Sequence, residues 1–87
     1  MNTFSLMISS PDGDLFRGEA TNLILRGTEG ELAVLAGHVP FVTAVKKGRC
    51  VVETAEGDRK TGIIEAGLLT VDAEKTTVLT SGVHWDS

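Results

Sequence analysis

Alternating apolar and polar residues open the chain. Phe4, Leu6 and Ile8 alternate with residues that are mostly polar, so one face of this run is apolar and the other is largely polar. The run Pro11-Asp12-Gly13 follows, in which proline fixes φ for a turn and glycine accepts the positive φ that closes it. The pattern predicts a half-buried first strand, a tight turn and a second strand beginning near Leu15.

The rest of the chain repeats this rhythm, with glycines at short, fairly even intervals between runs rich in Val, Ile, Leu and Thr. Such spacing is typical of an all-β domain. No window of twelve or more residues carries apolar positions at helical spacing without an interrupting glycine, so no substantial helix is expected. The further predicted strands are Ala20–Arg26, Glu31–Leu35, Phe41–Val45, Arg49–Ala55, Arg59–Glu65, Leu68–Asp72 and Thr76–Thr80.

These runs predict the fold class. Eight to ten short antiparallel strands should form a small all-β sandwich or flattened barrel. A chain of 87 residues buries about 60–65% of the surface exposed by its unfolded form, which suffices for one modest core. We therefore expect residues 1–87 to be a single domain, without a linker, a repeat or a large active-site cleft between domains.

The charge pattern narrows the range of partners. Eight Lys and Arg residues against twelve Asp and Glu residues give a formal net charge of −4, and the two signs are mixed along the chain. Nucleic acid is not expected as a partner, because the densest basic spots are only Lys46-Lys47 and Arg59-Lys60. No polybasic or amphipathic segment, secretory signal or run of about 20 apolar residues is present, so direct lipid insertion is not expected either.

Candidate catalytic and metal-binding residues are few. Cys50 is the sole cysteine and stands inside the apolar run of a predicted strand, which favours a small buried hydrophobe over a nucleophile. His38 and His84 are far apart and lack a carboxylate at ligand spacing. Carboxylate pairs such as Glu53 and Glu65 are better explained as exposed strand or turn residues. We expect no catalytic residue, no metal and no cofactor.

A long motif lies in the middle of the chain. The run GELAVLAGHVPFVTAVKKG, from Gly30 to Gly48, resembles the hallmark of the epsilon subunits of F-type ATP synthases, which is close to GE-x-G followed by two hydrophobic residues and P-G-H-x-P. Leu15-Phe16-Arg17-Gly18 is similar to the family's F-x-G, and two later runs are similar to its GG-x-L-x-V and V-x-V-L-A patterns. These later runs begin at Glu65 and Thr77, and the resemblance covers about residues 4 to 82.

The resemblance implies a fold and a function. In this family the amino-terminal part is a ten-stranded β-sandwich with no catalytic site of its own. It is a central-stalk rotor component of the proton-transporting ATP synthase, binds the gamma subunit and rests on the membrane c-ring, coupling ion flow to ATP synthesis. The same resemblance implies a peripheral membrane protein on the cytoplasmic side of a bacterial plasma membrane.

The family also implies contact residues. The turn bearing Glu29, Gly30 and Glu31 would touch the c-ring, and Glu31 is the first choice because an exposed carboxylate can pair with a basic group on the ring. His38 and Pro40 would shape the following loop or contact the stalk. A permanent gamma interface needs an apolar centre, so we expect one sheet face or edge to be partly apolar when isolated.

Three departures from the family pattern bear on this interpretation. Ala36 stands where the family usually has proline, and Ala66 stands where it has the first of two paired glycines. The typical member continues into a helical hairpin that can inhibit ATP hydrolysis, whereas this sequence ends at Ser87. The expectation is that this helical domain is absent, and with it the latch that inhibits ATP hydrolysis.

Two alternatives remain open at the level of sequence. The first is a stand-alone β-sandwich adaptor that keeps the fold without the synthase. The second is a small hydrolase that uses a carboxylate pair such as Glu53 and Glu65.

Overall fold

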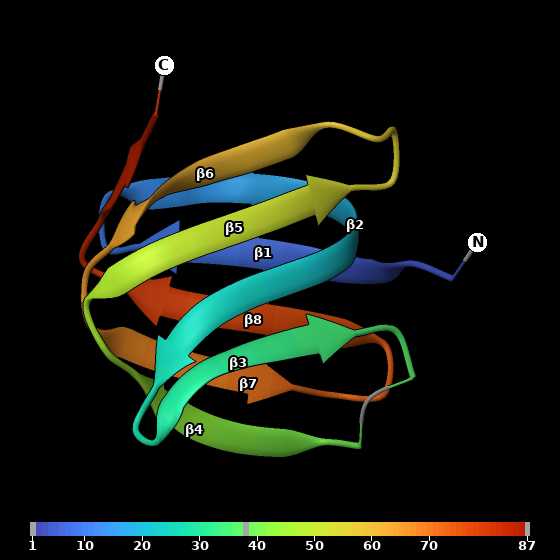
Figure 1. Ribbon diagram of the computed structural model, residues 1–87, viewed down its shortest axis with the longest axis horizontal. Coiled ribbons are helices and arrows are strands. Elements are labelled where there is room, and N and C mark those ends of the chain that lie inside the picture. The colour runs from blue at the N-terminus through green and yellow to red at the C-terminus, as the bar shows by residue number, and fades with distance from the viewer. Residues whose placement is uncertain (1, 38, 87) are drawn as a thin grey trace.

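The computed structural model describes residues 2–37 and 39–86. This part of the chain consists of strands and turns (Figure 1), and it contains no helix that could cross a membrane. Its nine strands are β1 (Phe4–Ser10), β2 (Gly13–Gly27), β3 (Gly30–Leu35), β4 (Phe41–Val45), β5 (Gly48–Thr54), β6 (Arg59–Ile64), β7 (Gly67–Val71), β8 (Lys75–Thr80) and β9 (Val83–Trp85).

The strands form one continuous sheet that is folded over on itself. The order is β4-β7-β8-β1-β2-β5-β6-β9, and β3 pairs with β2 beside this path. In Figure 1, β3 and β5 lie in front of β1, β7 and β8, which gives the two layers of a sandwich. The sheet is not closed into a barrel, because β4 and β9 end the path. The expected all-β sandwich is therefore confirmed, and the flattened-barrel form of it is not observed.

One strand pair departs from the predicted antiparallel arrangement. β1 pairs with β8 in parallel, from Ser5 opposite Lys75 to Ser9 opposite Leu79, whereas the other strand pairs of the described residues are antiparallel. A tight turn joins β1 to β2 and forces them to run in opposite directions. β8 reaches the other edge of β1 only after a long path through the second layer, so no hairpin constrains its direction.

The two runs predicted near Leu15 and over Ala20–Arg26 form a single strand of 15 residues, β2. Its first half pairs with β1, and its second half pairs with β3 and β5. The register shifts between Ala20 and Asn22, and a bulge of this kind bends a strand and increases its twist. Gly18 lies inside the strand opposite Leu6, so this glycine does not mark a turn. β2 thus belongs to both layers.

The core lies between the two layers and is made by the inward positions of eight strands. On β1 the alternation predicted from sequence holds, since Phe4, Leu6 and Ile8 are buried. Burying a side chain of this size contributes about 1.5–3 kcal/mol. The buried cluster comprises Phe4, Leu6, Ile8, Ala20, Leu23, Leu25, Val34, Val45, Cys50, Val52, Ile64, Leu69, Val71 and Val78.

The last strand, β9, was not predicted from the sequence because three residues are too few to show an alternation. It pairs with β6 very closely, and a Cβ on Gly62 would overlap the carbonyl oxygen of His84 and lie 2.9 Å from the Cα of Trp85. Lys60 Nζ lies 5.2 Å from the centre of the Trp85 ring and 5.7 Å from that of Phe16. These contacts attach β9 to the rest of the sandwich.

Candidate functional site

A two-residue turn joins β2 to β3 and carries the acidic tip singled out in the sequence. Gly27 and Gly30 are register partners, so Thr28 and Glu29 form the tip. Gly30 has φ of +122°, a conformation that L side chains rarely adopt, and this positive φ lets the chain turn back into β3. Gly27 is buried, and a Cβ there would lie 2.7 Å from Leu32 Cδ2. The turn therefore exposes the tip residues while its two glycines keep it tight.

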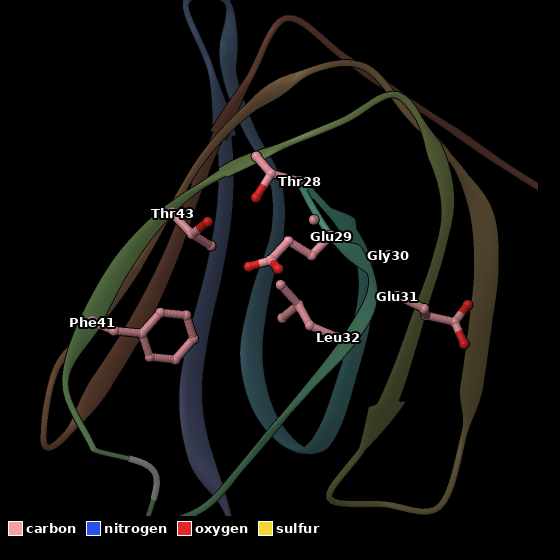
Figure 2. Close-up of a pocket in the computed structure, with 8 residues that line it drawn as sticks. Thr28, Glu29, Gly30, Glu31, Leu32, Phe41 and Thr43 are labelled. Atoms are coloured by element: carbon pink, nitrogen blue, oxygen red, sulfur yellow. The ribbon is translucent and has the colours of Figure 1, made fainter.

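The two carboxylates of this turn point to different sides. Figure 2 shows the Glu29 carboxylate directed toward Phe41 and Thr43, while the Glu31 side chain points away from them. Both residues are exposed, and neither has an ion-pair partner among residues 2–37 and 39–86. Each carboxylate can therefore accept hydrogen bonds from a cationic partner.

Glu29 overlooks a shallow groove at the open side of the sandwich. The groove has a volume of about 290 Å³ and is lined by the turn, Leu32, Phe41 and Thr43 (Figure 2). It opens where β3 of one layer faces β4 of the other, and the backbone N–H of Lys46 donates to the carbonyl of Arg26 across this side at 2.8 Å. The titratable residues that line the groove are Glu29 and Glu31, and their carboxylates point to different sides rather than toward each other.

Glu31 lies beside a second depression, on the outer surface of the sandwich. This depression has a volume of about 230 Å³ and is lined by Arg26, Gly30, Glu31 and Arg49. Arg26 is the register partner of Glu31 across the β2–β3 pair, and both arginines are exposed. The sequence motif contained Glu31 but gave no sign of these arginines, because the fold brings them in from two other strands.

The other predicted contact residues lie at the far end of β3. Pro40 is exposed and directly precedes β4, while His38 lies outside the described residues. The six residues of β3 span about 17 Å, so the structure does not bring Pro40 together with the acidic turn. As β4 is an edge strand, proline is tolerated just before it. The proposed roles of His38 and Pro40 stay predictions.

An apolar surface covers the outside of the layer formed by β4, β7 and β8. Val42, Leu68 and Leu79 are exposed by 62%, 42% and 51%, and Leu68 lies directly opposite Leu79. On the inner side of the same strands, Val45, Leu69 and Val78 are buried. These strands are thus apolar on both faces, which was visible in the sequence as apolar residues at consecutive positions. The expectation of a partly apolar sheet face is confirmed.

The residues considered for catalysis are not arranged for it. Cys50 is fully buried, and burial raises the pKa of its thiol to about 12, which confirms its interpretation as a small core residue. Glu53 accepts a hydrogen bond from Asn22 Nδ2 at 3.2 Å, while Glu65 lies 3.7 Å from Lys47 Nζ at the other end of the β5–β6 pair. The pair named for the hydrolase alternative is therefore not formed, because its two carboxylates lie at opposite ends of the β5–β6 pair. The described residues contain no group of three His, Cys, Asp or Glu that could hold a metal ion.

Comparison with known proteins supplies an independent result. Residues 3–86 match the family model described as "ATP synthase, Delta/Epsilon chain, beta-sandwich domain". The sodium-ion-specific ATP synthase epsilon chain of Acetobacterium woodii is 36% identical over 83 residues, covering 95% of this chain and 62% of the relative. The epsilon chain of Psychrobacter cryohalolentis is 38% identical over 79 residues, covering 91% of this chain and 57% of the relative. The chain thus spans about three fifths of these relatives.

Solved structures show the same fold at lower sequence identity. A chain of the Euglena gracilis mitochondrial ATP synthase superposes with a TM-score of 0.88 at 24% identity, covering 95% of this chain and 53% of that one. A chain of the central stalk and c-ring of the Tetrahymena thermophila mitochondrial ATP synthase gives a TM-score of 0.76 at 11% identity, covering 95% of this chain and 66% of that one.

Proposed function

Because the chain belongs to the delta/epsilon family of ATP synthase β-sandwich domains, we propose that it is a non-catalytic rotor subunit of an F-type ATP synthase. In this role it binds the gamma subunit and the c-ring in the central stalk and couples ion flow to ATP synthesis. The observation that carries the proposal is the match of residues 3–86 to this domain, with relatives named ATP synthase epsilon chain. These relatives favour the synthase subunit over a stand-alone adaptor.

Support for the gamma contact comes from the apolar surface of Val42, Leu68 and Leu79. A permanent subunit interface buries about 1,200–2,000 Å² or more and has an apolar centre. Exposed leucine and valine side chains on neighbouring strands supply such a centre, and they leave the molecule with apolar area to bury. We place the gamma subunit on this outer face of β4, β7 and β8.

Support for the ring contact comes from the β2–β3 turn. Thr28, Glu29, Gly30 and Glu31 are exposed in the β2–β3 turn at one end of the sandwich, whereas the residues of the apolar surface lie on β4, β7 and β8. Two partners can therefore bind at the same time. Glu31 is the residue that we place against a basic group of the ring, since its carboxylate points away from the groove and has no ion-pair partner among the described residues.

The architecture suits this mechanical task. Ion movement delivers about 2.3 kcal/mol per charge per 100 mV, and this energy has to reach the catalytic head as rotation. A close-packed sandwich core resists deformation, so a domain of this kind transmits torque between ring and stalk with little internal displacement. On this account the subunit is a peripheral membrane protein on the cytoplasmic side of a bacterial plasma membrane.

The direct test is to mix the purified chain with its cognate gamma subunit and apply the mixture to a size-exclusion column. At micromolar concentration the two proteins should elute together as a one-to-one complex. Separate elution would count against the proposed function.

A further inference from the structure

Four of the eight Lys and Arg residues gather at the end of the sandwich that carries the acidic turn. Arg26 lies at the end of β2, Lys46 and Lys47 form the turn between β4 and β5, and Arg49 lies at the start of β5. The hydrogen bond from Lys46 N–H to the Arg26 carbonyl ties these segments together. Arg26 also lies across Gly48, where an added Cβ would be 3.1 Å from its Cδ.

The opposite end of the sandwich also carries both signs. Its turns between β5 and β6 and between β7 and β8 carry Glu56, Asp58, Asp72 and Glu74, while Arg59, Lys60 and Lys75 stand at the starts of the strands that follow. The end expected to face the ring holds Asp12, Glu29, Glu31 and Glu65 together with the four cations, so it offers a partner groups of both charges.

Arg26 and Arg49 line the same depression as Glu31, so a group bound there lies beside both arginines. Neither arginine forms an ion pair with another of the described residues. Burying an arginine at an interface without an acceptor is costly, whereas a carboxylate matches its planar fork of donors. A partner that offered only basic groups would bury both Arg26 and Arg49 without an acceptor.

We propose that Arg26, Arg49 and Glu31 form a mixed-charge site for a polypeptide loop of the ring that carries a carboxylate beside a basic side chain. This inference rests on the proposed function and specifies the chemistry of its ring contact. The basic side chain pairs with Glu31, and the carboxylate accepts hydrogen bonds from the arginines. A lipid phosphate fits less well, because Glu31 lies in the same depression and would repel it.

The test compares variants of the full chain in which both arginines are replaced, each bound to gamma, for binding to the detergent-solubilised c-ring. Arg26→Gln with Arg49→Gln should lower the affinity for the ring about tenfold or more, because close charge pairs at an interface contribute substantially. Arg26→Lys with Arg49→Lys keeps the charge but loses the fork, and should bind with intermediate affinity. Gamma binding and thermal unfolding should be unchanged in both variants.

A matched control removes two cations from the opposite end, through Arg59→Gln with Lys75→Gln. These residues begin β6 and β8, and their loss should change ring affinity less than twofold. Unchanged or tighter ring binding by the Arg26 and Arg49 glutamine variant would overturn the inference, because an acidic turn acting alone gains from losing nearby cations.

Two further outcomes are informative. If the wild-type chain with gamma does not bind the ring at all, the proposed function itself fails. If vesicles containing anionic phospholipid but no ring bind the wild-type chain and not the glutamine variant, the arginines contact lipid and the inference is overturned.

Discussion

At the scale of single residues, the direction of the side chain distinguishes Glu29 from Glu31, two carboxylates that the sequence presents as equivalent. Glu29 lies in the turn and Glu31 in the strand that follows, so the backbone sends their side chains to different sides (Figure 2). The sequence motif could rank them only by general chemistry. In the structure Glu29 overlooks the groove beside Phe41, and Glu31 lies with Arg26 and Arg49.

Reversing the charge of Glu31 tests its position at the ring contact. Glu31→Arg should leave gamma binding intact and weaken the coupling of ion flow to ATP synthesis, because it opposes the basic group that Glu31 meets. Coupling is measured as ATP synthesis at a fixed ion gradient in reconstituted vesicles. Glu56→Arg, an exposed turn residue at the opposite end, is the control and should have no effect. Equal loss of gamma binding and coupling would mean that the contact is wrongly placed.

The buried thiol of Cys50 predicts how the free energy of unfolding depends on pH. Burial raises the pKa of its thiol from 9.0 to about 12, so the folded state holds this proton more tightly than the unfolded state. The resulting contribution to stability is fully present below pH 9 and is lost as the pH rises toward 12. Between pH 8 and pH 10 the free energy of unfolding of the wild type should fall by about 1 kcal/mol more than that of Cys50→Ala. Urea denaturation at the two pH values measures this, and parallel losses would contradict it.

At the scale of elements, local patterns located most strands but not their partners. The alternation of Phe4, Leu6 and Ile8 and the turn at Gly13 are local signals, and both were predicted. The parallel pairing of β1 with β8 and the passage of β2 through both layers depend on contacts between distant segments, which no short pattern encodes. For the same reason the acidic turn was found from sequence, while Arg49 beside it was not.

The close pairing of β7 with β8 yields a prediction on stability. A Cβ on Gly67 would overlap the carbonyl oxygen of Leu79 and lie 3.1 Å from the Cα of Thr80. Gly67→Ala should therefore lower the free energy of unfolding by about 1–3 kcal/mol, because the backbone has to shift. Gly82→Ala is the control, since nothing lies within 4 Å of its Cβ position. Urea titration of both variants decides the matter, and equal midpoints would show that β7 and β8 are not packed in this way.

At the scale of the whole molecule, two surfaces at different places explain how a small domain can join two partners. The acidic turn lies at one end (Figure 1), and the apolar surface of Val42, Leu68 and Leu79 lies on the outer face of β4, β7 and β8. The whole molecule has extents of 29 × 28 × 24 Å, and force applied at one surface reaches the other through the packed side chains of its core.

Charged substitutions test whether gamma binds the apolar surface or another face of the molecule. Val42→Asp with Leu79→Asp should lower gamma affinity at least tenfold without unfolding the domain, because both side chains are exposed in the free chain. Ile63→Asp is the control: Ile63 is also an exposed apolar residue, at 42%, but it lies on β6 of the other layer and should leave gamma binding unchanged. Isothermal titration calorimetry gives both affinities. A larger effect from Ile63→Asp would move the gamma contact to the other face.

The central claim is that this sandwich joins gamma to the ring, and the most direct measurement is the assembly of all three components. Purified c-ring, gamma and the chain should form a stoichiometric complex, in which ring-bound gamma increases when the chain is added. Mass photometry of the mixture, with and without the chain, records this. An unchanged amount of ring-bound gamma, with the chain left unbound, would contradict the account.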